Sequence, residues 1–405
     1  MMRSRQATFR SFIAGAALVG VGWSDARAEV VSDKAAAIVV WPVVYVSQPA
    51  DTLIQLGNTS AAPVRAHCFY SNANTHCSNT GQLCFRGGDC CTGSSCGLCL
   101  PGWSETDFNV VLTAGQPIAW QASEGLQTFC SDATVWYPCI PIDGTSRKGP
   151  PDPTDPSGRR FQSNAGTRIP SVPEAPFVGE LRCIVVDDTG APVVGSGANV
   201  LVGHATTNFG GVFDAAKSNA IGIRALDNPA NDASDGRLVL GGDGAQYEGC
   251  PSVLILNHFF DFAEDPVTNR TITTFPIFVP CTANYLAQVP GSAIAQYLVF
   301  NEFEQRFSTS NTVRCFYGGF PLSNIDTTQN QNSIFSAGVE GTLVGQTRVS
   351  AIGDGLLGLL LEERNGATVD QSGPSSDPEF ERFFSAETNV DFQGQRPTSD
   401  VITLP

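Results

Sequence analysis

The chain has 405 residues, with 39 acidic side chains against 23 Lys and Arg, and its formal net charge is −16. Such an acidic surface repels phosphate backbones and anionic lipid headgroups, so the composition disfavours nucleic-acid binding and electrostatic membrane association. The 41 Gly, 26 Pro and 25 Phe favour short strands and turns over long helices, so we expect an all-β fold.

The first 28 residues have the pattern of a secretory signal peptide. Three arginines, Arg3, Arg5 and Arg10, precede the apolar run 12–23, and the small residues around Arg27 predict cleavage after Ala28. The run is shorter than the roughly 20 apolar residues of a membrane-spanning helix, so no membrane span is expected. The pattern predicts a chain that is secreted, periplasmic or held at the cell surface. A buried N-terminal helix is the alternative.

Residues 29–225 are expected to form an immunoglobulin-like β-sandwich. The evidence is a series of short, partly alternating apolar runs separated by turn signals. In the second run, Ile54 and Leu56 share one face of a strand. Pro42 in the first run predicts an edge strand or a bulge, because proline donates no backbone hydrogen bond. The expected strands are 37–46, 51–60, 63–72, 107–115, 116–123, 179–188 and 198–207.

Two insertions interrupt this first module. Residues 76–101 contain six of the 13 cysteines and are expected to form a small disulfide-rich insertion. Residues 141–177 are rich in Pro, Gly and charged side chains. Because such a segment buries too little apolar surface to order itself, we expect a long exposed loop there.

A second β-sandwich domain is predicted over residues 226–405. The stretch SAAPVRAHCFYSN in the first half resembles STSNTVRCFYGG in the second, since each combines a polar turn, Val-Arg and Cys-Phe-Tyr. This similarity favours two related sandwiches in tandem, with a boundary near residues 225–236. Chance similarity of a short segment is the alternative. The expected strands are 236–242, 251–262, 270–281, 293–308, 312–320, 332–352 and 356–365.

The cysteines of the insertion follow the order C…C…CC…C…C. They are Cys77, Cys84, Cys90, Cys91, Cys96 and Cys99. Together with the stretch GGDCCTGSSCG, this pattern resembles the inhibitor cystine knot of small secreted toxins, antifungal peptides and protease inhibitors. The resemblance implies the pairs Cys77–Cys91, Cys84–Cys96 and Cys90–Cys99. Secretion favours disulfides over the alternatives, a zinc site or a redox-active Cys-x-x-Cys.

The seven remaining cysteines are an odd number, so at least one is expected to stay unpaired. Two of them lie on expected strands of the first sandwich and could bridge it, and two others are close enough to bridge a loop. The expected bridges are Cys68–Cys183, Cys130–Cys139 and Cys250–Cys281. This assignment leaves Cys315 free and buried, and a Cys281–Cys315 bridge is the alternative.

No strong catalytic motif stands out in the sequence. The chain has four histidines and neither a His-Glu-x-x-His nor a Ser-x-x-Lys motif. His258 is near Asp261 in sequence, but we favour a histidine packed within a strand. Glu302 and Glu304 share one face of an expected strand, where paired carboxylates serve glycoside hydrolysis, and a solvated face is the simpler interpretation. We therefore expect no catalytic residues, no metal and no cofactor.

Taken whole, the chain resembles secreted bacterial proteins with tandem immunoglobulin-like modules, a resemblance that implies a fold and a location but no activity. The leading hypothesis is a non-enzymatic structural or binding protein of the cell surface or matrix, with an unknown protein or cell-surface partner. The first alternative is an inhibitor or toxin-like effector that presents a loop containing Phe85, Arg86 and Asp89. The second is a hydrolase with an unrecognised site.

Overall fold

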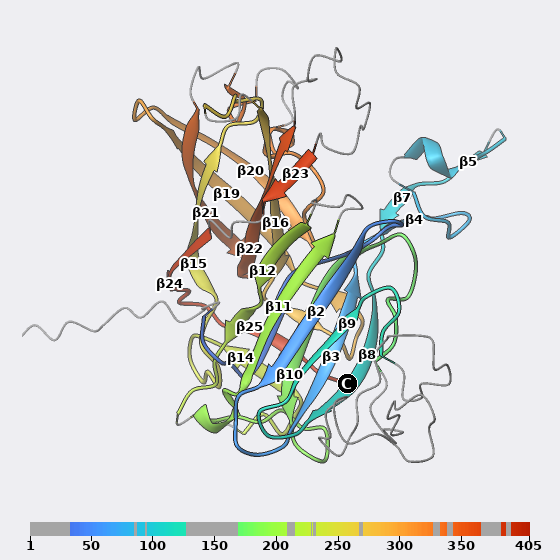
Figure 1. Ribbon diagram of the computed structural model, residues 1–405, viewed down its shortest axis with the longest axis vertical. Helices are drawn as coiled ribbons and strands as arrows, with labels where there is room; N and C mark the ends of the chain where they lie inside the picture. The colour runs from blue at the N-terminus through green and yellow to red at the C-terminus, as the bar shows by residue number, and fades with distance from the viewer. Residues whose placement is uncertain are drawn as a thin grey trace, which may run out of the picture.

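The computed structural model describes residues 33–84, 87–93, 95–126, 169–208, 215–227, 229, 232–266, 270–326, 333–337, 343–365, 382–385 and 390–405. In this part of the chain the regular structure consists of β-strands, with three short 3₁₀ turns as the helical segments (Figure 1). The expected all-β fold is therefore confirmed for these residues. The predicted signal peptide, residues 1–28, and the expected Cys130–Cys139 bridge lie outside the described residues.

The first half forms two antiparallel sheets. One sheet has the order β13 (Ile221–Ile223), β1 (Ile38–Val46), β10 (Phe177–Val186), β3 (Val64–Asn72) and β8 (Ser104–Leu112). The other has the order β12 (Ala215–Asn219), β11 (Leu201–Asn208), β2 (Asp51–Asn58) and β9 (Pro117–Gln121). In β2 alternate residues are buried, including Ile54 and Leu56, because one face of the strand is turned to the core.

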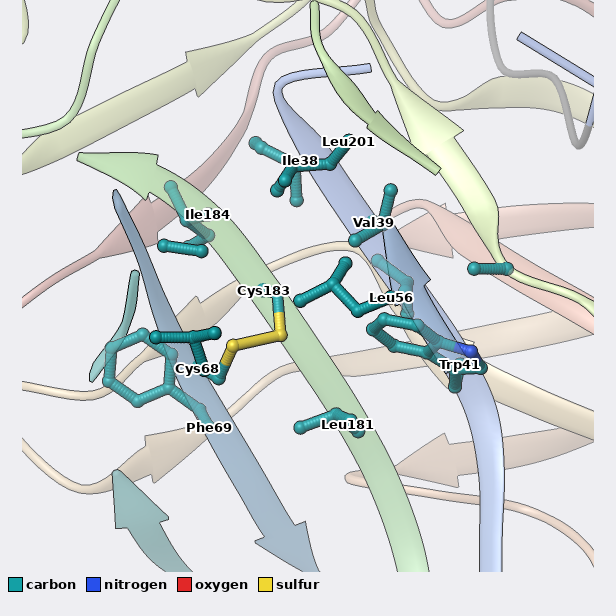
Figure 2. Packing of buried hydrophobic residues seen from close by; sticks show 14 of the residues in the cluster. Ile38, Val39, Trp41, Leu56, Cys68, Phe69, Leu181, Cys183, Ile184 and Leu201 are labelled. Atoms are coloured by element: carbon teal, nitrogen blue, oxygen red, sulfur yellow. A yellow bond between two sulfur atoms is a disulfide. The ribbon is translucent and has the colours of Figure 1, made fainter. Parts of the chain in front are cut away.

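The two sheets pack face to face through interlocking side chains (Figure 2). Trp41 of β1 is fully buried and lies against Gly203 of β11, where a Cβ atom would come within 2.2 Å of the indole ring. The glycine thus makes room for one of the two buried tryptophans of the core. The pairing of β1 with β10 shifts between Trp41 and Val44, so Pro42 marks a bulge. Strand β13 pairs with β1 only over Ile38–Val40, so at Pro42 β1 has β10 as its one paired neighbour among the described strands and lies locally at the sheet edge.

The expected exposed loop 141–177 is wrong for its described end, residues 169–177. Ile169 exchanges two backbone hydrogen bonds with Leu126, at 2.8 and 3.0 Å, and both side chains are buried. Phe177 is also buried and begins β10. The many prolines and charged residues of this segment favoured a loop prediction, although a few apolar residues in it anchor its end to the core.

The second half contributes three further sheets. The largest has the order β20 (Arg306–Arg314), β19 (Ser292–Asn301), β21 (Val344–Gly353), β15 (Pro251–Phe259) and β24 (Val390–Gln395). A second has the order β16 (Thr271–Pro280), β22 (Leu356–Asn365) and β23 (Arg382–Ser385). A small sheet joins β14 (Arg237–Leu240), β25 (Asp400–Thr403), β17 (Ala283–Asn284) and β18 (Val289–Pro290).

The sequence repeat does not correspond to equivalent positions in the two halves. Cys68 lies within β3, directly opposite Cys183 of β10. Cys315 instead follows the last residue of β20 and has a φ of 65°. The same Cys-Phe-Tyr stretch is therefore in a strand in one half and at a strand end in the other.

The hydrophobic core continues across the expected boundary near residues 225–236. A single cluster of buried side chains contains Trp41 and Leu181 from the first half together with Tyr247, Tyr285 and Leu357 from the second. Phe69 of β3 stacks on Tyr285 with ring centroids 4.0 Å apart. The described residues thus form an all-β structure whose halves share a packed interface, with a small disulfide-rich region added to the first half.

Candidate functional site

A disulfide-rich module links β3 to β8 and projects from the sheets of the first half (Figure 1). Its stem is the antiparallel pair β4 (Thr75–Cys77) and β7 (Cys99–Pro101). Its outer part contains the 3₁₀ turn η1 (Gly87–Cys90) and a hairpin of β5 (Cys91–Thr92) and β6 (Ser95–Cys96). We call residues 75–101 the stapled module.

The disulfides of the stapled module do not follow the cystine-knot pattern. The structure pairs Cys77 with Cys90, Cys84 with Cys99 and Cys91 with Cys96. All three pairs differ from those that the resemblance implied, so the knot connectivity is wrong. The physical reason lies at the adjacent pair, since Cys90 is buried in the module and Cys91 is exposed in the outer hairpin, directly opposite Cys96.

The sulfur atoms of Cys77, Cys84 and Cys90 lie within 4.8 Å of one another. A zinc site needs cysteine thiolates, and each of these sulfurs is bonded in a disulfide. With Cys99, the three cysteines form the small core of the module. The prediction that these cysteines form disulfides is confirmed.

A carboxylate from outside the module holds its base in place. Glu174 accepts hydrogen bonds from the side chains of Asn72 at 2.7 Å, Asn74 at 2.5 Å and His76 at 3.1 Å. Burial raises the pKa of Glu174, but these three hydrogen bonds outweigh burial and leave the pKa lowered. Asn74 also donates to the carbonyl of Pro176 at 2.8 Å. The residues that precede β10 thus fix the angle at which the stapled module leaves the sheet.

Sequence reasoning missed Glu174, because it lies in the segment expected to be an exposed loop. The only local signal is its position between prolines, in Pro173-Glu174-Ala175-Pro176. Proline restricts the backbone on both sides, so a carboxylate there can be held in one position without a strand around it. Its three partners, however, are about 100 residues away in sequence and could not be assigned without the fold.

The stapled module exposes two large apolar side chains to solvent. Leu98 is 67% exposed and Leu100 is 46% exposed. Of the three residues expected to form a binding loop, Asp89 is exposed at η1, whereas Phe85 and Arg86 lie outside the described residues. The other exposed residues that the structure describes in the module are mostly polar, among them Ser78, Asn79 and Gln82, so the two leucines stand out on a polar surface.

The other disulfides hold the body of the protein. Cys68 pairs with Cys183 between β3 and β10, and Cys250 pairs with Cys281, the two partners expected in each case. Cys315 is a free, buried thiol, and burial raises its pKa well above the ordinary value. Such a thiol is protonated at neutral pH and behaves as a small apolar side chain.

His258 is packed within the second half and is not paired with Asp261. Its Nδ1 atom lies 3.0 Å from the carbonyl oxygen of Phe259 and its Nε2 atom 2.8 Å from the hydroxyl of Thr347. Asp261 accepts backbone hydrogen bonds from Thr274 and Ser323 instead, at 2.8 and 2.7 Å. The two side chains therefore do not form an acid–base pair.

The carboxylates Glu302 and Glu304 do not share a strand face. The expected strand 293–308 ends at Asn301, and residues 302–305 form the turn between β19 and β20. The side-chain oxygen of Asn301 accepts the backbone N–H groups of Phe303 and Gln305, at 3.0 and 2.9 Å, which closes the turn. Glu302 caps the N–H groups of Leu343 and Val344. The expectation of a strand with paired carboxylates is wrong.

Comparison with known proteins does not indicate a function for this chain. The chain matches no family model, and no curated protein is similar enough to identify a relative. None of the helical segments in the described residues has the length and apolar character that a bilayer-spanning helix needs.

The buried His258 predicts a measurable pH dependence of stability. Burial lowers its pKa from 6.5 to about 4, so the unfolded chain binds more protons than the folded chain between these values. The stability that neutral His258 provides is complete above pH 6.5 and is lost as the pH falls through about 4, by at most about 1.4 kcal/mol per pH unit. The stability advantage of the wild type over His258→Gln is expected to shrink in that range, as measured by urea denaturation at each pH.

Asp261 acts in the opposite direction over much of the same range, because burial raises its pKa to about 6. Asp261 is present in both the wild type and His258→Gln. Its contribution to the pH dependence of stability therefore cancels when the two proteins are compared in the same buffer. A stability difference that stays constant from pH 4 to 6.5 contradicts a neutral, buried His258.

Proposed function

We propose that this chain is a non-enzymatic extracellular binding protein that contacts a protein or cell-surface partner through its stapled module. The observation that carries the proposal is the pair of exposed leucines, Leu98 and Leu100, on a segment fixed by three disulfides and anchored by Glu174. A surface that is already ordered loses little conformational entropy on binding. Covering exposed apolar side chains with a partner makes the free energy of binding more favourable by about 25 cal/mol for each Å² buried.

The disulfides favour an oxidising compartment as the place of action. Five disulfide bonds occur within the described residues, and such bonds form and persist outside the cytosol. The signal-peptide pattern of residues 1–28 agrees with this location.

The histidines give little support to an enzymatic role. Within the described ranges, each of the four has a polar side-chain partner: Asp107, Glu174, Asn219 and Thr347 for His67, His76, His204 and His258, respectively. None of these partners is a Ser or Cys nucleophile activated by a carboxylate-bound histidine, the arrangement typical of acyl transfer. A binding role is therefore better supported than a hydrolytic one.

For the fold, we propose an immunoglobulin-like core in the first half. Strand β2 pairs with β9 in one sheet and β3 pairs with β10 in the other. Strands B with E and C with F are paired in this way in immunoglobulin-like sandwiches. The disulfide departs from that pattern, since Cys68–Cys183 joins two neighbours of the same sheet instead of bridging the two sheets.

The proposal is tested by measuring the binding of labelled full-length protein to intact cells of the organism that produces it. The double variant Leu98→Ser/Leu100→Ser is expected to lose about tenfold or more in affinity, because each leucine buried by a partner contributes about 1.5–3 kcal/mol. The matched control is Ile294→Ser/Ile352→Ser, which changes two exposed, paired residues of β19 and β21. This control is expected to bind as the wild type does.

Two results contradict the proposal. One is saturable binding that is equal for the wild type and both double variants. The other is the absence of saturable binding by the wild type, measured with the disulfides intact.

A further inference from the structure

An apolar cavity of about 210 Å³ lies where the two halves of the chain meet. One wall comes from the first half, with Val43 of β1 and Ala216 and Ser218 of β12. The other wall comes from the second half, with Phe275 and Ile277 of β16 and Phe316. The same residues, apart from Ser218, belong to a hydrophobic cluster that is separate from the main cores, and Figure 1 shows β12 beside β16 and β22.

The sequence explains why packing leaves a space here. Residues of β12 alternate between solvent and interior, so Ala216 and Ser218 point inward and Ala215 and Lys217 point outward. The inward side chains are small. They face the larger Phe275 and Ile277, which do not extend far enough to fill the volume between the strands.

The side chains that line the cavity disfavour a charged ligand. No lining residue has a charged side chain, so an ionised ligand would lose its hydration without gaining an ion pair. An apolar cavity of roughly 150 Å³ is large enough for benzene. The present cavity is larger, and three of its lining side chains, Tyr45, Phe275 and Phe316, are aromatic.

One polar group in the cavity is available to a ligand. Ser218 is only 9% exposed, and its hydroxyl makes no side-chain hydrogen bond in the described part of the chain. The other buried hydroxyl of the lining, on Thr207, already shares a hydrogen bond with Thr52 at 3.0 Å. A ligand with one hydrogen-bonding group could therefore be oriented by Ser218, while its ring fills the apolar space.

We propose that this cavity binds a small, uncharged aromatic compound with a single hydrogen-bonding group, of the size of phenol or indole. The site is built from strands of both halves and uses no residue of the stapled module, so it is independent of the proposed partner surface. A ligand bound there contacts both halves at once and links small-molecule binding to the stability of their interface.

The test uses indole as the probe and isothermal titration calorimetry on the full chain. The wild type is expected to bind indole saturably, and Ala216→Leu is expected to weaken binding about tenfold or more, because the added side chain occupies the cavity. Ala215→Leu is the matched control, since it makes the same change on the outward face of β12, and it is expected to bind as the wild type does. Ser218→Ala is expected to weaken binding about threefold to tenfold through loss of one hydrogen bond.

Circular dichroism and thermal unfolding check that Ala216→Leu is folded, and the smaller Ala216→Val replaces it if it is not. Indole-3-acetate, an anionic relative of the probe, is expected not to bind. The proposal is overturned if the wild type shows no saturable binding of indole, or if the folded position-216 variant binds as tightly as Ala215→Leu. Leu98→Ser/Leu100→Ser is expected to retain indole binding, which separates this site from the proposed function.

Discussion

Replacing Arg182 with methionine is expected to destabilise the folded chain by about 3–5 kcal/mol, because it leaves a buried carboxylate without its partner. Arg182 is fully buried, and Glu180 is only 5% exposed. Their side chains form an ion pair, with Nη2 of Arg182 3.0 Å from Oε2 of Glu180. Without the guanidinium, the side-chain hydrogen bond that Glu180 keeps is the one from the hydroxyl of Ser71, at 3.3 Å.

The same guanidinium also connects the two halves. Arg182 donates to the carbonyl oxygens of Cys281 at 2.8 Å and Pro280 at 3.0 Å, at the end of β16. Arg182→Met therefore leaves two backbone acceptors without these bonds as well, and their loss is part of the expected destabilisation of about 3–5 kcal/mol. Cooperative unfolding of both halves is expected, since the substitution affects the interface they share.

The measurement is chemical denaturation of the full chain, followed by circular dichroism and fluorescence. Two variants serve as controls. Glu180→Leu/Arg182→Met removes both charges and is expected to recover part of the lost stability. Arg65→Met breaks an exposed ion pair with Asp188 and is expected to cost at most about 1 kcal/mol. A loss of that small size for Arg182→Met contradicts the role assigned to the buried pair.

The ion pair also shows what the sequence could not predict about the fold. Alternation of apolar and polar residues indicates a strand with one buried face, and β2 follows that rule. Strand β10 is buried on both faces, because one packs in the first half and the other lies against the second half. A charged pair at Glu180 and Arg182 is typical of an exposed face, so the pattern by itself conceals the interface between the halves.

Turns that lie within an alternating sequence are a second feature of the fold that the sequence pattern could not predict. The run 293–308 keeps an apolar or amphipathic pattern throughout, yet the chain reverses at residues 302–305. The side-chain amide of Asn301 provides the turn hydrogen bonds, and Glu304 adopts a φ of 61°. The turn thus depends on hydrogen bonds to one asparagine side chain, which hydrophobic periodicity does not reveal.

The sequence predicted where the stapled module lies and that disulfides hold it together, but it did not predict which cysteines pair. Clustered cysteines in a segment with almost no apolar core predict disulfide staples, and the structure has them. The pairing depends on which way Cys90 and Cys91 point, and the chain changes conformation between them: Cys90 ends the 3₁₀ turn η1, whereas Cys91 begins the hairpin strand β5. Cys90 therefore joins the interior with Cys77, and Cys91 joins Cys96 across the outer hairpin.

Removing the Cys68–Cys183 disulfide by Cys68→Ala/Cys183→Ala is expected to destabilise the chain by about 4–5 kcal/mol. The two cysteines are 115 residues apart in sequence, so the bond removes much of the conformational entropy of the unfolded chain. Both sulfurs are buried between β3 and β10, and Figure 2 shows them among the residues of the main core. Chemical denaturation under oxidising conditions measures the loss while the other disulfides stay intact.

The matched control is Cys250→Ala/Cys281→Ala, which removes a disulfide between two equally buried cysteines that are only 31 residues apart. Both double variants replace the same atoms and leave similar spaces in the core, so packing losses are comparable. If restriction of the unfolded chain dominates, the control loses about 3–4 kcal/mol, about 1 kcal/mol less than Cys68→Ala/Cys183→Ala. Equal losses, or a larger loss for the shorter loop, show that native-state packing around the sulfurs outweighs loop length in this protein.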